Sequence, residues 1–512
     1  MLIGSQGSIQ TKAVIFTEEA ISIPSGVPTE GLATRFFRTG SPLQGALFVL
    51  LLWAALYLPN TALRPLYQEE GRRALLAIDV YENGNWFTPA VAGERYRNKP
   101  PLLPWMIAAA AAFTGGVNEL AVRLPSLLFT LLGALLVFVF VRPHVRFSAA
   151  LFSSAVFLLS PLVIEKARMG ETDMIVTVMC MAALTLWWRG LSAGRLHWHT
   201  WVAAGCCLTV AAMAKGPPPL SFFAVTVGAT AWAKKRYRDF PGILFSLFLP
   251  LAAVSLWAAT GYDTGDLSLY AREMRLVADP GSPGAYALRR LSAGVEILLA
   301  LMPWLAVGFA VFVPKWRQRL EARKDLAEIL TVYSLLIPAI LLFWVGSRPR
   351  YVMPAVPTVA VASGLVWDAL GRRRNRRMSQ WLLAIVCTAA AGVFAYHAIA
   401  VPLLQERYNR ERHIAVAIGE ALKEVPGPVV AVHLSHNLVY YSGLAARSVT
   451  LKQVRGIPPP YTMAAHCGIY ARLPAYCDCR WEIFKTIEAG ENERYCLARI
   501  TAADDGESPG SE

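Results

Sequence analysis

Residues 65–105 read PLYQEEGRRALLAIDVYENGNWFTPAVAGERYRNKPPLLPW and form a polar segment directly after the first apolar run of the chain. Acidic, basic, amide and indole side chains crowd together here. Ionisable groups next to lipid are costly and are usually kept for a function. We therefore expect this segment to contain the functional site. The apolar runs around it should determine the fold class.

The composition is that of a polytopic membrane protein. Of the 512 residues, 55% are hydrophobic and 16% are charged, whereas soluble domains contain about 25% charged residues; the mean hydropathy is +0.41. The apolar runs do not alternate with polar residues, which favours an all-α bundle over a β-barrel. They lie at residues 44–60, 124–141, 147–163, 174–188, 200–214, 217–233, 241–259, 291–313, 328–346, 351–370 and 380–400.

Basic loops set the expected orientation. The net charge of +14 comes largely from these loops, and no nucleic-acid-binding signature accompanies it, so we expect no nucleic-acid partner. With the N-terminus inside, every loop assigned to the cytoplasm is basic, as the positive-inside rule requires. About 11 spans then leave the C-terminus outside. This parity requires residues 101–113, which are apolar but short, to form a juxtamembrane helix in the interface.

The chain is expected to divide into three parts. Residues 1–43 form a disordered cytoplasmic tail, residues 44–400 form the membrane domain with a catalytic outer loop at 61–123, and residues 401–512 form a small extracytoplasmic α/β domain. In the last part, residues 405–424 have the pattern of an amphipathic helix and residues 428–433 that of a buried strand.

Four cysteines gather in this C-terminal part. An even set of this kind predicts two disulfides in an oxidising compartment, with three possible pairings. A zinc site is the competing interpretation, but the spacing lacks a second close pair. The four are Cys467, Cys477, Cys479 and Cys496.

Several loops assigned to the outside keep basic residues against the sorting bias. Arg168, Lys215, Arg348 and Arg350 each follow an apolar run on that side. Cations held there predict a binding site for an anion at the outer leaflet, and phosphate is the natural candidate. Scattered contacts to lipid head groups are the alternative explanation.

An ordered set of motifs resembles bacterial transferases related to the lipid A aminoarabinose transferase and the protein O-mannosyltransferases. The matching segments are residues 69–72, 84–89, 96–105, 119–126, 167–174, 215–217 and 347–351. The resemblance implies the glycosyltransferase-C fold and the bacterial inner membrane. It also implies transfer of a sugar from a polyprenyl (undecaprenyl-type) phosphate to an acceptor at the outer face, which would be lipid A, another envelope glycan or a protein.

The resemblance also assigns roles. Glu69, Glu70 and Asp173 would be catalytic, because a carboxylate can accept the proton of an attacking hydroxyl or amine. The side chains implied to bind the carrier phosphate, and to stabilise it as it departs in an inverting displacement, are Arg72, Lys99, Arg168, Lys215, Arg348 and Arg350. A head-group-facing acid at Glu69 and a helix N-cap at Thr172–Asp173 are the plainer readings.

The sequence departs from the family pattern at three places. Glu69 stands where the family has Asp, Arg73 where it has Tyr, and Asn98 where it often has Glu. A divalent metal ion held by Asn98 and Asp173 would therefore be weakly bound, since the amide oxygen of Asn98 is neutral.

We expect a monomer whose partners are the lipid-linked sugar, its acceptor and membrane lipids. Two other functions stay open: a transporter or flippase of lipid-linked sugars, and a catalytically inactive relative that acts in envelope assembly. A transporter would show polar residues at the bilayer midplane and inverted repeats, whereas here the polar residues lie at the outer ends of the runs.

Overall fold

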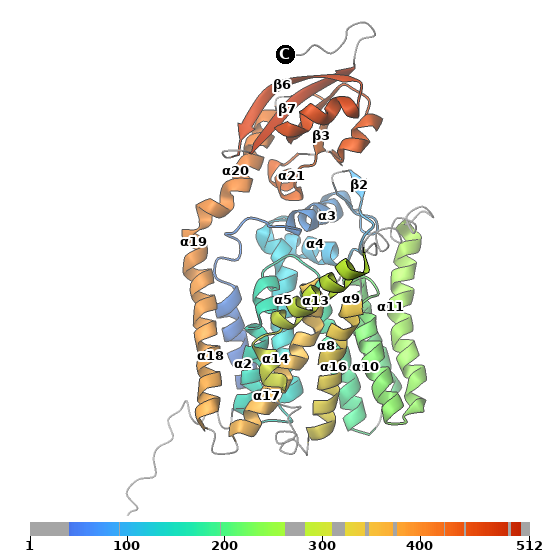
Figure 1. The fold of residues 1–512 in the computed structure, drawn as a ribbon, viewed down its shortest axis with the longest axis vertical. Helices are drawn as coiled ribbons and strands as arrows, with labels where there is room; N and C mark the ends of the chain where they lie inside the picture. Colours follow the sequence, from blue (N-terminus) through green and yellow to red (C-terminus); the bar gives the residue numbers. More distant parts are fainter. Residues whose placement is uncertain are drawn as a thin grey trace, which may run out of the picture.

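The protein is a helical bundle capped at one end by a small sheet (Figure 1). The computed structural model describes residues 40–91, 93–194, 196–261, 282–309, 323–343, 348–371, 376–423, 425–444, 447–489 and 493–502. Most of the expected N-terminal tail, parts of the loops 272–290, 314–327 and 371–379, and the acidic C-terminal end lie outside these residues.

The bundle consists of apolar helices that follow the expected runs closely. In the part of the chain that the structure describes, six helical segments are long and apolar enough to cross a membrane: residues 119–141, 173–192, 237–260, 325–342, 349–370 and 380–403. The helices are α2 (Pro42–Tyr57), α5 (Glu119–Val141), α6 (Phe147–Leu158), α7 (Pro161–Lys166), α8 (Asp173–Ser192), α9 (Trp198–Lys215), α10 (Leu220–Ala233), α11 (Phe240–Gly261), α16 (Lys324–Phe343), α17 (Val356–Gly371) and α18 (Arg376–Ala395). The expectation of a mostly helical protein with several candidate membrane spans is therefore confirmed.

Local signals in the sequence explain where these helices begin. α2 starts at a capping box, in which the Ser41 hydroxyl accepts a hydrogen bond from the Gln44 N–H and Pro42 occupies the first turn. α5 starts at Asn118, whose side-chain oxygen accepts from the Ala121 N–H at 2.9 Å. Such caps satisfy N–H groups that have no partner within the helix.

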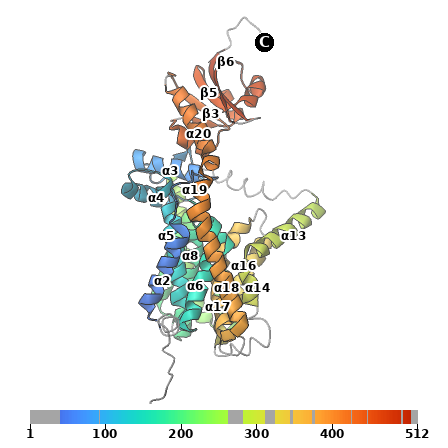
Figure 2. The same cartoon turned by 90° about the vertical axis from the view of Figure 1, so that its left-hand side faces the viewer.

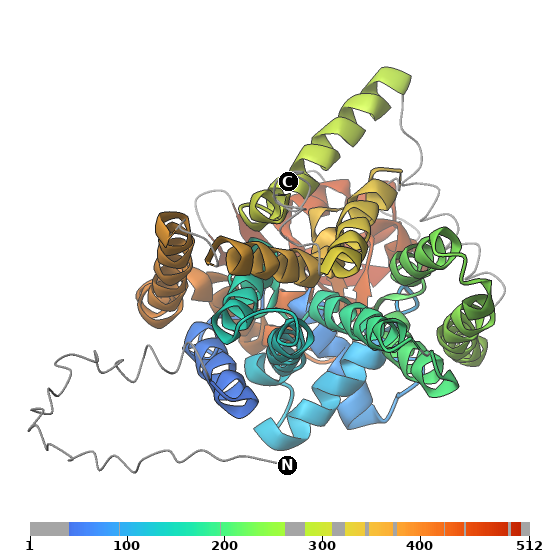
Figure 3. The same cartoon turned by 90° about the horizontal axis from the view of Figure 1, so that it is seen from below.

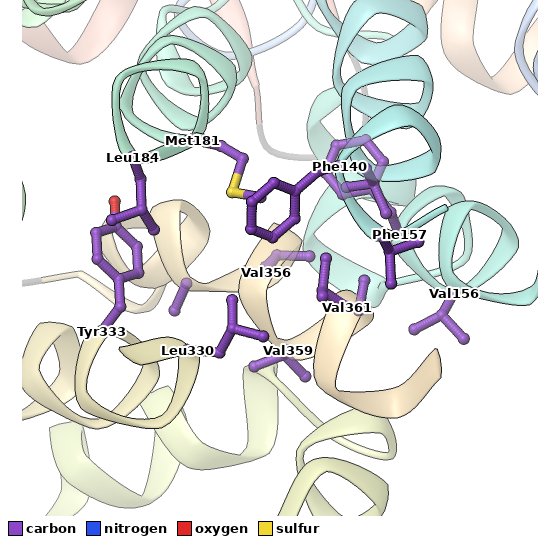
Figure 4. Packing of buried hydrophobic residues seen from close by; sticks show 14 of the residues in the cluster. Phe140, Val156, Phe157, Met181, Leu184, Leu330, Tyr333, Val356, Val359 and Val361 are labelled. Carbon is purple, nitrogen blue, oxygen red and sulfur yellow. The ribbon is translucent and has the colours of Figure 1, made fainter. Parts of the chain in front are cut away.

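Large apolar side chains fill the centre of the bundle (Figure 4). Phe157 of α6 and Met181 of α8 are almost fully buried, and Val356 and Val361 of α17 pack into the same cluster. Seen along the bundle, α17 lies close to α5 and α6 while α11 and α18 lie at opposite margins (Figure 3). Close packing matters here because lipid tails are as apolar as the side chains, so dispersion contacts hold the helices together.

One expected span is not a single helix. Residues 291–313 were expected to cross the membrane, but α13 (Pro283–Ala300) projects away from the bundle (Figure 2) and a separate short helix, α14 (Trp304–Phe309), follows it. The break falls at Pro303, which has no N–H to donate and cannot continue the helix. Leu288, Leu291 and Leu299 of α13 are exposed, so this helix presents an apolar face outside the bundle.

Two helices from the opening segment lie across one end of the bundle. α3 (Glu70–Asn83) and α4 (Leu102–Thr114) run beneath the sheet (Figures 1 and 2), joined by a short hairpin of β1 (Ala90–Val91) and β2 (Glu94–Arg95). Each helix ends at a glycine in the left-handed region, Gly84 with φ 71° and Gly115 with φ 76°, where a residue without a Cβ is favoured. α4 lies where the short apolar segment 101–113 was expected to form a helix.

Beyond α3 and α4 lies a five-stranded sheet in the order β4-β3-β5-β7-β6. β3 pairs in parallel with β4 and β5, and β7 pairs antiparallel with β5 and β6. The strands are β3 (Val429–Val432), β4 (Arg447–Val449), β5 (Tyr461–His466), β6 (Cys479–Glu488) and β7 (Arg494–Ala502). The expected helix and buried strand correspond to α20 (Gln405–Leu422) and β3.

The sheet is covered on both faces. α20 and α21 (His436–Ser442) pack on one face through Ile418 and Leu438. On the other face, the 3₁₀ segments η6 (Leu451–Gly456) and η7 (Cys467–Ala475) enclose Met463. The four cysteines pair as Cys467–Cys496 and Cys477–Cys479, which selects one of the three pairings.

The short helix α21 is the contact between the sheet unit and α3. The Gly71 N–H donates to the side-chain oxygen of Asn437 at 3.0 Å, and the Tyr441 hydroxyl accepts from the Leu66 N–H at 2.6 Å. Tyr441 also donates to Glu119 at 2.9 Å. A Cβ on Gly71 would lie 2.3 Å from the Asn437 oxygen, so this close approach requires glycine.

We predict that Gly71→Ala loosens this contact and lowers the thermal unfolding midpoint of the purified protein. Forcing an extra methyl group into a packed contact costs about 1–3 kcal/mol. Gly392→Ala is the matched control, because nothing lies within 4 Å of a Cβ at Gly392. An unchanged midpoint for Gly71→Ala would show that the contact between α21 and α3 does not contribute to stability.

Candidate active site

The first turn of α3 holds two neighbouring acids in different surroundings. Glu69 is the N-cap residue of α3 and Glu70 its first residue, and their side chains point in different directions because successive residues are turned by about 100°. The Glu70 side chain is 1% exposed, whereas that of Glu69 is 36% exposed. The two acids therefore cannot share one task.

Glu70 forms a buried, two-pronged ion pair with Arg123 at the start of α5. The Arg123 Nε and one Nη each donate to a separate Glu70 oxygen at 2.9 Å. The same two oxygens accept from the backbone N–H groups of Gly170 and Tyr67, each also at 2.9 Å. Bidentate pairs of this kind are strong and directional.

Arg123 is satisfied as completely as its partner. Its two Nη atoms also donate to the backbone carbonyls of Thr61, Arg64 and Pro65, at 2.6, 2.7 and 2.9 Å. The pair therefore ties together the connection from α2 to α3, the start of α5 and the turn at Gly170. Because both oxygens of Glu70 are already engaged, the geometry supports a positioning role for Glu70 in place of the catalytic role expected from the sequence.

Glu69 is the more open carboxylate. Arg72 lies 2.9 Å from it and Arg73 3.9 Å. Partial burial acts to raise the pKa of Glu69, but the charges of Arg72, Arg73 and Lys99 outweigh it and lower the pKa. Glu69 is consequently an ionised carboxylate near neutral pH and is able to accept a proton.

Lys99 follows the β1–β2 hairpin and lies among other cations. Burial, followed by the nearby charges of Arg73 and Lys215, lowers the pKa of Lys99 to about 7, although Asp173 acts in the opposite direction. Like charges held this close are unfavourable unless an anion joins them. The charges around Lys99 would therefore be relieved by an anion at this position.

The start of α8 and the segment before α17 supply the opposite wall. Lys215, at the end of α9, forms a short hydrogen bond to Asp173 and lies over the Tyr351 ring, 4.3 Å from its centroid. Arg350 donates to Glu171 at 2.7 Å. Asp173 is 3% exposed and held by Lys215, so it is less open to a substrate than Glu69. Thr172 makes no side-chain cap to α8.

Five cations thus gather around Glu69 and Asp173, and we call them the basic cluster: Arg72, Arg73, Lys99, Lys215 and Arg350. Four of them were expected from the sequence, and Arg73 was not assigned to the site. The Arg73 side chain is 4% exposed and donates to the Tyr96 hydroxyl at 3.1 Å. The sequence did contain one signal for a role of Arg73, because this residue stands where the resembling transferases have tyrosine.

Two expected phosphate contacts lie apart from this cluster. Arg168 donates to the backbone carbonyl of Pro59 at 2.8 Å, and its pKa is lowered to about 10 by burial and by Arg123 and Arg64. The side chain of Arg348 is exposed at the start of the segment Pro349–Ala355. The structure therefore does not bring either side chain to Glu69.

The expected metal ligands do not fit a divalent cation. Asn98 is exposed, and an Asp173 oxygen is taken by the Lys215 ammonium. Within the described residues, no group of three or more His, Cys, Asp or Glu side chains could hold a metal ion. Because the basic cluster also opposes a positive ion, we derive no step through a metal.

The C-terminal unit brings one further residue to this site. His436, the first residue of α21, lies near Glu69, Arg72 and Arg73, and burial together with Arg72 lowers its pKa to about 4. His436 is therefore a neutral imidazole at neutral pH. No motif in the sequence linked it to residues more than 300 positions earlier, since the contact is made only by the docking of α21.

The arrangement of helices identifies the fold class of this membrane protein, and comparison with a solved structure supports the same fold. ArnT from Cupriavidus metallidurans, solved bound to undecaprenyl phosphate, superposes with a TM-score of 0.67 at 15% identity, covering 89% of this chain and 97% of that one. That match establishes the fold, which is the glycosyltransferase-C fold.

Sequence comparison then confirms the expected resemblance. The dolichyl-phosphate-mannose-protein mannosyltransferase family matches residues 98–258. The undecaprenyl phosphate-α-4-amino-4-deoxy-L-arabinose arabinosyl transferase of Erwinia tasmaniensis is 29% identical over 335 residues, which are 62% of this chain and 58% of that protein. Its counterpart in Enterobacter sp. is 26% identical over 412 residues, covering 75% and 69% of the two chains. The chain is a relative of these transferases and spans about three fifths of the length of the Erwinia protein.

We predict that Glu70→Gln destabilises the fold strongly, because removing one partner of a buried ion pair leaves the other charge uncompensated, at about 3–5 kcal/mol. The measurement is the thermal unfolding midpoint in detergent. Glu82→Gln, at an exposed position of the same helix, should leave the midpoint unchanged. If Glu70→Gln unfolds like the wild type but loses turnover, Glu70 is catalytic after all.

Proposed function

We propose that the protein is a glycosyltransferase that moves a sugar from a polyprenyl phosphate to an acceptor at the outer face of the bacterial inner membrane. One observation carries the proposal: Glu69 is an ionised, partly open carboxylate that lies beside the basic cluster. A base next to an anion site is the arrangement that displacement of a sugar from a phosphate requires.

The reaction follows from this arrangement. Glu69 accepts the proton of the acceptor hydroxyl or amine as its oxygen or nitrogen attacks the anomeric carbon. The bond from that carbon to the phosphate oxygen breaks, and its electron pair leaves with the prenyl phosphate. A single displacement of this kind inverts the anomeric configuration. Arg72 and Arg73 hold the Glu69 carboxylate in place, at 2.9 and 3.9 Å.

The basic cluster stabilises the leaving group. Lys99, Lys215 and Arg350 approach the site from three different elements, so that a phosphate among them would be met from several sides. Donors that are already in position lower the barrier because no reorganisation is needed as charge develops. Arg168 and Arg348, which lie apart, would contact the head groups of surrounding lipids or a later part of the substrate.

The prenyl chain needs an apolar surface next to this site. Trp86 and Phe87 are exposed in the loop after α3. The Trp105 indole donates to the backbone carbonyl of Trp86 at 2.5 Å, and the Trp257 indole donates to that of Phe87 at 2.9 Å. Aromatic side chains favour the boundary between lipid and water. We assign the first part of the prenyl tail to this surface.

We further propose about 11 spans, with the N-terminus in the cytoplasm and the sheet unit outside, as a separate extracytoplasmic α/β domain from residue 401 onward. The basic loops and the paired cysteines support this orientation, because disulfides persist in oxidising compartments. The protein would act as a monomer, and the acceptor would be lipid A, another envelope glycan or a protein.

The two other functions have less support from the site. A flippase needs polar groups in the middle of the bilayer, whereas the basic cluster lies at helix ends such as that of Lys215. An inactive relative would have lost its base, whereas Glu69 keeps an ionised carboxylate in the place of the family's Asp.

We predict that Glu69→Gln lowers sugar transfer at least about 100-fold, because the amide cannot accept the acceptor proton. The measurement is mass spectrometry of envelope lipids and glycans from a deletion strain that carries the variant at normal expression. Glu82→Gln is the matched control, and Asp173→Asn tests the second acid. Unchanged transfer in both Glu69→Gln and Asp173→Asn would overturn the proposed activity.

We also predict that binding of a short-chain prenyl phosphodiester weakens as the pH rises from 7 to 9. Below pH 7 Lys99 is already charged. Above its pKa of about 7, an anion must bind together with a proton, so affinity falls by up to about tenfold per pH unit. Lys99→Arg stays charged throughout and should flatten the profile. Equal slopes for the two proteins would exclude Lys99 from the phosphate site.

A further inference from the structure

The charges around Glu69 do not balance. With Lys99 protonated, the state that a bound anion favours, the basic cluster carries five positive charges, and among the described residues three carboxylates face it: Glu69, Glu171 and Asp173. Each of these carboxylates is already paired, Glu69 with Arg72, Asp173 with Lys215 and Glu171 with Arg350. Lys166 adds no net charge, because it pairs with the nearby Glu165 at 2.8 Å.

Two cations account for the excess, Arg73 and Lys99. The Arg73 guanidinium is almost fully buried, and its Nε has no hydrogen-bond partner among the described residues. Arg350, whose charge also acts to lower the pKa of Lys99, likewise has an Nε without a partner in the described part of the chain. Buried charges act over longer distances than exposed ones, because little water screens them.

A single phosphodiester does not compensate this excess. It carries one negative charge, so that one of the two excess positive charges stays uncompensated. The relatives named above act, by their names, with an amino sugar, and such a donor has no net charge when its amine is protonated. All three carboxylates that the described residues bring to the site are occupied, so none of these is left to receive that ammonium group.

We propose that the donor of this protein carries a second negative charge next to the phosphodiester, and that Arg73 and Lys99 receive it. The charge would come from a carboxylate on the sugar or from a second phosphate in the linkage to the lipid. This inference rests on the proposed function and narrows its substrate class. Arg73, standing in the place of the family tyrosine, is the residue that sets this preference.

The experiment measures equilibrium binding of four short-chain prenyl probes to the purified full-length protein at pH 7 and low salt. They are a phosphate-linked neutral sugar, a phosphate-linked uronic acid, a diphosphate-linked neutral sugar and a phosphate-linked amino sugar. We expect at least one of the doubly charged probes to bind about tenfold more tightly than the neutral-sugar probe, and the amino-sugar probe to bind weakest. The doubly charged probe with the greater gain identifies the source of the charge.

Variants test which residues are responsible. Arg73→Gln should reduce the advantage of the doubly charged probe severalfold, and Lys99→Gln should do the same without disturbing the buried contact between Arg73 and Tyr96. Arg95→Gln removes an exposed cation four positions from Lys99 and should leave the advantage unchanged.

The outcomes separate the two proposals. If neither doubly charged probe binds more tightly than the neutral-sugar probe, or if the amino-sugar probe binds best, the inference about the second charge is wrong and the transferase assignment stands. If none of the four probes binds, the proposed function itself fails.

Discussion

The buried pair of Glu70 and Arg123 holds together the end of the molecule at which the site lies. Arg123 satisfies two oxygens of Glu70 and three backbone carbonyls between α2 and α3, while Glu70 also accepts from the turn before α8. Ion pairs in a poorly hydrated interior are costly unless every donor and acceptor is used. Because all of them are used here, the pair can define the positions of three chain segments at once.

That frame gives the neighbouring Glu69 its freedom. α3 is anchored through Glu70 to Arg123 and through Gly71 to Asn437, so the adjacent Glu69 side chain is presented in a defined direction. The two adjacent acids differ because successive side chains at the start of a helix point in different directions. Glu70 is buried, whereas Glu69 stays partly exposed. The positive excess around Glu69 can persist for the same reason, because a rigid frame resists relaxing away from repulsion.

The sheet unit also contributes hydrogen bonds to the end of the bundle at which the site lies. Tyr440 and Tyr441 of α21 bond the carbonyl of Val117 and the side chain of Glu119, at 2.6 and 2.9 Å, next to the start of α5, from which Arg123 projects. These hydrogen bonds join the C-terminal unit to the bundle close to the buried ion pair. His436 reaches the neighbourhood of Glu69 as a consequence.

The sequence by itself determined the class of the fold, since apolar runs about as long as a bilayer leave helices as the only solution. It also indicated the polar segment and most of the basic cluster, because ionisable residues beside lipid stand out against their surroundings. It could not separate Glu69 from Glu70, bring His436 to the site or divide residues 283–309 into α13 and α14. Those features depend on contacts between residues far apart in the chain, such as Glu70 with Arg123 and Gly71 with Asn437. Burial and hydrogen-bond satisfaction exist only once these segments have packed, so only the tertiary structure decided which acid is locked in place and which is left to react.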